Sequence, residues 1–91
     1  MKNSEYNYTE HITYSELGVQ EVGHRDIELG WNSITRLVSY VKDMRKEFFD
    51  FIDIIDNKTG AVLATFSPKG LIYADDDFYK IFFLEYYDNL D

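Results

Sequence analysis

The sequence predicts an α+β fold in which an antiparallel sheet carries its helices on one face. Three patterns in the 91 residues support this prediction. Residues 6–15 alternate with the two-residue period of a half-buried strand, residues 34–48 repeat apolar side chains at helical spacing, and two turns separate three apolar runs after residue 49. A chain of this length builds one hydrophobic core, so we expect a single domain over residues 1–91.

The first predicted unit is an N-terminal hairpin. Residues 6–14 place Tyr6, Tyr8, Glu10, Ile12 and Tyr14 on one parity of a strand. The segment 16–18 is expected to turn the chain, and residues 19–22 and 25–29 read as a second strand that is interrupted near Gly23.

The clearest element is an amphipathic helix at about residues 33–47. Its apolar positions recur every three or four residues, with charged residues between them. Asn32 or Ser33 can cap its first N–H groups, and Arg45 and Lys46 suit the negative end of its dipole.

Two further turns predict a three-stranded meander. The segments 51–55, 61–66 and 71–74 are apolar, and the turns 56–60 and 67–70 contain glycine and the single proline. Asp75, Asp76 and Asp77 then precede an aromatic segment that lacks glycine and proline. Acids at its start favour a helix, and an edge strand is the alternative for residues 78–90.

Composition excludes several classes of protein. The chain has no cysteine, and therefore no disulfide, thiolate nucleophile or cysteine-based zinc site. The first ten residues lack an apolar segment of the kind found in signal peptides, and no apolar run approaches the roughly 18–20 residues that span a bilayer. We expect a cytoplasmic protein that does not interact with membranes.

The charge of the chain is strongly acidic and unevenly placed. The net charge is −8 at pH 7; residues 31–48 carry +2 and residues 71–91 carry −5. Such a chain repels nucleic acid and attracts basic partners, so we expect a basic protein partner and no direct nucleic-acid binding. The basic residues of the central helix, Arg36, Lys42, Arg45 and Lys46, are too few to change this expectation.

Motifs for metal binding and catalysis are weak. The run 75–77 fails as an EF-hand, because the sixth loop position is Lys80 and the twelfth is Tyr86. His11 and His24 would pair across the predicted hairpin near Glu10, Asp26 or Glu28, but no nucleophile stands at a recognisable spacing. Glycines 60 and 70 stand alone in turns, unlike those of a phosphate-binding loop. We therefore expect no enzymatic activity, no metal and no cofactor.

Acidic residues interleaved with aromatics remain at both ends of the chain. In size, acidity, absence of cysteine and the Asp- and Tyr-rich segment 75–91, the chain resembles small phage-encoded anti-defence inhibitors, of the anti-CRISPR and anti-restriction kind. The resemblance rests on composition and layout, with no shared motif. It implies inhibition of a host nuclease by occlusion, in the host-cell cytoplasm.

The leading functional hypothesis is an acidic inhibitor that occludes the cationic nucleic-acid-binding groove of a larger protein. The expected contact residues are Asp75, Asp76, Asp77, Glu85 and Asp88, with Tyr79 and Tyr86 as anchors. The alternatives are a wholly solvated acidic surface over an aromatic core, and a homodimer that assembles through the aromatic C-terminal segment, where Phe83 and Tyr87 would be central.

Overall fold

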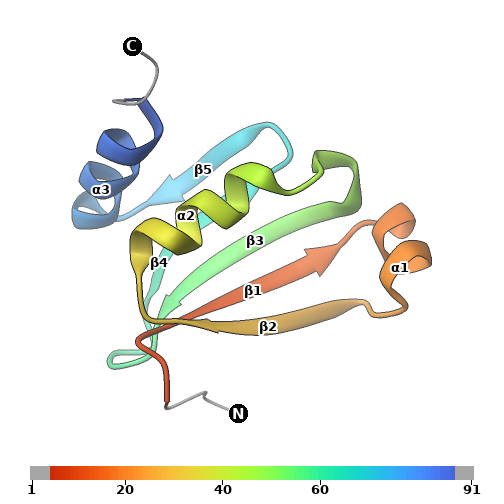
Figure 1. Cartoon of the computed structure of the whole chain (residues 1–91), viewed down its shortest axis with the longest axis horizontal. Helices are drawn as coiled ribbons and strands as arrows, with labels where there is room; N and C mark the ends of the chain where they lie inside the picture. The colour runs from red at the N-terminus through yellow and green to blue at the C-terminus, as the bar shows by residue number, and fades with distance from the viewer. Residues whose placement is uncertain (1–4, 88–91) are drawn as a thin grey trace.

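A computed structural model describes residues 5–87, with side chains described up to residue 81. It confirms the α+β prediction: a five-stranded sheet, antiparallel throughout, is combined with three α-helices (Figure 1). The strands are β1 (Tyr8–Tyr14), β2 (Asp26–Trp31), β3 (Phe49–Asp56), β4 (Val62–Ser67) and β5 (Gly70–Ala74). The helices are α1 (Glu16–Val22), α2 (Ile34–Asp43) and α3 (Asp76–Tyr87), with a short 3₁₀ turn, η1 (Lys46–Phe48), before β3.

The strand order is β2-β1-β3-β4-β5, so the first strand of the chain lies inside the sheet. The predicted meander of β3, β4 and β5 is confirmed. The N-terminal pair β1 and β2 joins it through the contact of β1 with β3, in which Tyr8 lies opposite Asp56 and Ile12 opposite Ile52.

One prediction for the N-terminal region was wrong, because residues 16–22 form the helix α1 and not a turn followed by a strand. The Ser15 side chain accepts a hydrogen bond from the backbone N–H of Gly18 at 3.1 Å and so caps the helix. Gly23 ends the helix in the left-handed conformation, with φ of 81°, and its N–H donates to the carbonyl of Val19. Valines 19 and 22 favoured the strand prediction, but this pair of caps outweighs their weak preference.

The central helix is confirmed but is shorter than the predicted 33–47. Ser33 caps it by accepting a hydrogen bond from the N–H of Arg36, and the helix ends at Asp43 because Met44 is extended. This early end redirects the chain through η1, so that Phe49 enters the core at the start of β3 and is only 3% exposed.

The C-terminal segment is helical within the described residues, so its alternative reading as an edge strand was wrong. Asp75 caps α3, because its Oδ1 accepts a hydrogen bond from the N–H of Phe78 at 2.8 Å. The Phe78 ring is buried and meets the Phe66 ring edge-on, with 6.3 Å between the centroids.

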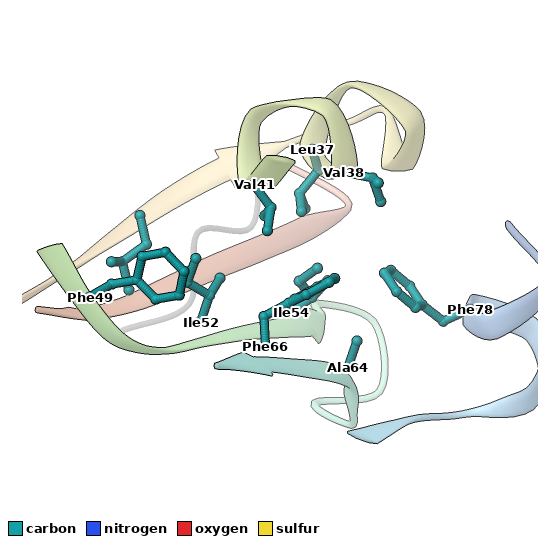
Figure 2. Close-up of a cluster of buried hydrophobic side chains, with 10 residues drawn as sticks. Leu37, Val38, Val41, Phe49, Ile52, Ile54, Ala64, Phe66 and Phe78 are labelled. Carbon is teal, nitrogen blue, oxygen red and sulfur yellow. The ribbon is translucent and has the colours of Figure 1, made fainter. Parts of the chain in front are cut away.

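The core lies between α2 and one face of the sheet (Figure 2). Leu37, Val38 and Val41 point from α2 toward the strands, and Phe78 closes the side nearest α3. The strand residues of the core are Ile12, Phe49, Ile52, Ile54, Ala64 and Phe66. No described helix is long and apolar enough to cross a membrane.

Candidate protein-binding face

The opposite side of the sheet, here called the open face, points away from α2 and the core. Side chains alternate between the two faces of a strand, so the neighbours of the core residues Ile12, Ile52 and Ile54 belong to the open face. The strand registers align one such residue from each strand in a single row: Glu28, His11, Asp53, Thr65 and Tyr73.

The row places a histidine between carboxylates. His11 lies opposite Glu28 on one side and opposite Asp53 on the other. The Nε2 atom of His11 is also 3.9 Å from Oδ1 of Asp26. The Thr65 hydroxyl donates a 2.7 Å hydrogen bond to Oδ1 of Asp53, which fixes that carboxylate on the surface of the sheet.

A hollow of about 640 Å³ continues the open face at its end beside α1. Its lining includes the carboxylates of Glu16, Asp26 and Asp50 and the guanidinium of Arg25. Together with Glu28 and Asp53, these three carboxylates form a group that we call the acidic face. A guanidinium or ammonium group from another protein would meet several carboxylates here.

Large apolar side chains are also exposed on the open face. Phe51 lies two residues before Asp53 on β3 and is 47% exposed, while Tyr73 ends the row on β5 and is 50% exposed. Val62 lies opposite Ile55 at the other side of the row and is also exposed. Exposed aromatic side chains on a face that also carries charge are typical of a protein-binding surface.

The N-terminal segment covers the far end of the open face. The ring of Tyr6 packs against Gly30, and the Asn57 side chain donates a hydrogen bond to the Tyr6 carbonyl at 2.9 Å. The Thr9 hydroxyl donates to Oδ1 of Asn57 at 2.8 Å. These contacts cover the open face at the end of the strands that is farther from α1. The acidic part of the face therefore lies toward α1.

The predicted N-terminal acidic and aromatic group is divided between the two faces. Glu10 is wholly buried on the core face, where its Oε1 accepts a hydrogen bond from the indole of Trp31. Glu10 therefore cannot interact with His11, which lies on the other face of the sheet. The two histidines do not pair, since the register places Glu28 opposite His11 and leaves His24 in the exposed loop before β2.

Those predicted C-terminal contact residues that the structure describes lie elsewhere, in α3 or directly before it. Asp75 is engaged as the helix cap, while Asp76, Asp77 and Tyr79 are exposed in the first turns of the helix. The side chains of Glu85 and Tyr86, like those of Phe83 and Tyr87, and the whole of Asp88 lie outside the described part of the chain. Since α3 packs through Phe78 on the core side, Asp76 and Asp77 form a group separate from the acidic face.

Sequence reasoning missed most of the acidic face. Asp26 and Glu28 were noted only as neighbours of a histidine, and Asp50 and Asp53 were not singled out. For Asp53 the available signal was in β3, where Phe51 and Asp53 alternate with the buried residues Ile52 and Ile54. Among the side chains of residues 5–81, no three from His, Cys, Asp or Glu are arranged so that they could hold a metal ion. Comparison of the chain with protein-family models, curated proteins and solved structures found no match.

Proposed function

We propose that this protein is a non-enzymatic binding protein that engages a basic surface of a larger protein through its acidic face. The observation that carries the proposal is the clustering of five carboxylates, with Arg25 and His11 as their basic neighbours, on one side of the sheet. Such a surface attracts a positively charged partner and orients it during encounter.

Exposed apolar side chains supply the second part of the argument. Carboxylates alone keep a protein soluble, and contacts between exposed charges contribute little to affinity. Phe51 and Tyr73 would give a partner the aromatic anchors that usually dominate binding energy. The combination of exposed aromatic side chains with clustered carboxylates favours a docking surface over a surface that only contacts solvent.

The most concrete form of the function is occlusion of a nucleic-acid-binding groove, such as that of a defence nuclease. A groove of this kind carries the lysines and arginines that neutralise phosphates, and carboxylates compete for the same groups. The exposed acids of α3, Asp76 and Asp77, offer a second contact region on the same partner.

The test is affinity capture from host-cell extract at low and high salt, followed by identification of the partner. The double variant Asp26→Asn/Glu28→Gln should lose the salt-sensitive partner, and Phe51→Ala should weaken its retention. Glu21→Gln/Asp43→Asn is the matched control, because it removes two exposed acids from α1 and α2 and should bind normally. The purified partner should then release duplex DNA when the natural chain is added.

Three results would overturn this assignment. Equal binding by the two double variants would exclude the acidic face as the contact. A captured partner that binds DNA and this chain together would exclude occlusion. Recovery of the chain alone, with a doubled mass in light scattering, would instead favour the homodimer.

A further inference from the structure

A second cavity, on the other side of the molecule from the acidic face, has the opposite electrostatic character. It encloses about 400 Å³ between the end of α2, η1, the β4–β5 turn and the first turns of α3. Its floor is the outer edge of the core, formed by Val41, Phe49, Phe66 and Leu71. This floor offers apolar contacts to a small molecule.

Three lysines stand around this apolar floor. Lys42 comes from α2, Lys46 from η1 and Lys69 from the β4–β5 turn, so lysines from three separate elements line the cavity. No aspartate or glutamate is among the described residues that line the cavity. In a chain with a net charge of −8 and only nine lysines and arginines, a lining that contains three lysines and no described acid is a marked local reversal of charge.

Two of these lysines have no acidic partner within the part of the chain that the structure describes. Neither Lys46 nor Lys69 forms an ion pair there, whereas the nearby Arg45 is paired with Glu47. An ammonium group is a compact charge that suits a carboxylate, sulfonate or phosphate oxygen. The cavity therefore combines an apolar floor with two lysines that an anionic group of a ligand could pair with.

We propose that this cavity, the lysine pocket, binds a small anion with an apolar body, such as an aromatic or aliphatic carboxylate. The volume lies at the lower end of the range for small-molecule sites, which suits one ring system or a short chain. The apolar body would lie against Phe49, Phe66 and Leu71, and the anionic group would lie between Lys46 and Lys69. This site is independent of the acidic face and of its partner.

Titration with the fluorescent anion 8-anilinonaphthalene-1-sulfonate tests the proposal on the folded chain. Lys46→Gln/Lys69→Gln should weaken binding of the probe at least about tenfold, because two charges that face the sulfonate are removed. The control Lys58→Gln/Lys80→Gln removes two exposed lysines outside the pocket and should bind like the natural chain. Unchanged circular dichroism and thermal melting establish that each variant is folded.

Three further measurements separate the parts of the proposal. N-phenyl-1-naphthylamine, which lacks the sulfonate, should bind more weakly than the sulfonate probe, and decanoate should displace the probe where inorganic phosphate does not. The proposal would be overturned if both double lysine variants lost the same affinity for the sulfonate probe. It would also be overturned if the neutral probe bound as tightly as the sulfonate probe. Displacement by phosphate alone would show that the apolar body is not recognised. Sedimentation with phosphatidylglycerol vesicles that depends on Lys46 and Lys69 would assign the pocket to lipid headgroups in place of a free small molecule.

Discussion

The indole Nε1 of Trp31 donates a 2.9 Å hydrogen bond to Oε1 of Glu10, and this bond holds a carboxyl group inside the core. Glu10 is wholly buried beneath α2, and its Oε2 has no hydrogen-bond partner among residues 5–87. Burial raises the pKa of Glu10 to about 7, and the Trp31 bond opposes that rise only in part. Burial also raises the pKa of Tyr14, with smaller contributions from Tyr40 and Glu10.

Stability should therefore depend on the protonation of Glu10. The folded chain binds this proton more tightly than the unfolded chain, whose glutamate has a pKa near 4.5. Protonation of Glu10 therefore stabilises the folded chain. This contribution is complete below pH 4.5 and is lost as the pH rises through about 7, which lowers the free energy of unfolding by roughly 3 kcal/mol. In Glu10→Gln this dependence should disappear, so that the variant gains roughly 2–3 kcal/mol relative to the natural chain between pH 5 and pH 8.

Denaturant unfolding at a series of pH values, followed by the fluorescence of the single tryptophan, measures this effect. Glu28→Gln is the matched control, because its carboxyl is exposed on the neighbouring strand. A Glu10→Gln variant whose unfolding free energy kept the pH dependence of the natural chain would contradict the assignment.

The approach of α1 to η1 leaves no room for a side chain at Gly18. A methyl group there would overlap the backbone carbonyl of Phe48, which also accepts a hydrogen bond from the N–H of Ser15 at 3.0 Å. We expect Gly18→Ala to lower the free energy of unfolding by about 1–3 kcal/mol, since backbone must move to admit it. Leu17→Ala, at a neighbouring exposed position, should change stability much less in the same denaturant titration.

The three aspartates before α3 should differ in their effect on stability. Asp75→Ala removes the cap on the N–H of Phe78 and should cost about 1 kcal/mol. Asp76→Ala removes the same charge from an exposed position and should cost only a few tenths of a kcal/mol, by loss of a favourable interaction with the helix dipole. Thermal melting of the two variants checks the difference, and equal melting temperatures would exclude Asp75 as the cap.

Two phenylalanines on opposite sides of the sheet should separate folding from binding. Phe78→Ala removes the anchor of α3 from the core and should cost about 3–5 kcal/mol of stability. Phe51→Ala alters an exposed side chain of the open face and should leave the unfolding transition nearly unchanged. A large loss of stability in Phe51→Ala would mean that this ring serves the fold and would remove it as a binding anchor.

The elements with strong local signals were predictable from the sequence. The apolar spacing of residues 34–41 identified α2, and the turns around Gly60 and Gly70 identified the meander. Helix α1 was missed, because its seven residues include two valines, which favour strands, although Ser15 and Gly23 mark its two ends. Boundaries that depend on tertiary contacts, such as the end of α2 before Phe49, could not be read from periodicity.

The candidate sites were harder to predict than the fold, since they depend on pairings between distant strands. Only the registers of β1 with β2 and β3 bring Glu28, His11 and Asp53 into one row. Glu10 differs, because alternation correctly placed it on the face of Ile12, yet its charge suggested an exposed acid and not a wholly buried one. Charge counted along the chain likewise gave no sign that Lys42, Lys46 and Lys69 surround one cavity.

The strand order has a consequence for how the chain reaches its native state. Pairing of β1 with β2 and pairing within the meander join segments that are close in sequence, whereas Tyr8 must find Asp56, which is 48 residues away. Closing a long loop has an entropic cost that is recovered only after the contact forms. The meeting of β1 and β3 is thus the step expected to set the folding time, and until it occurs each half of the sheet presents an unpaired hydrophobic strand edge to other molecules.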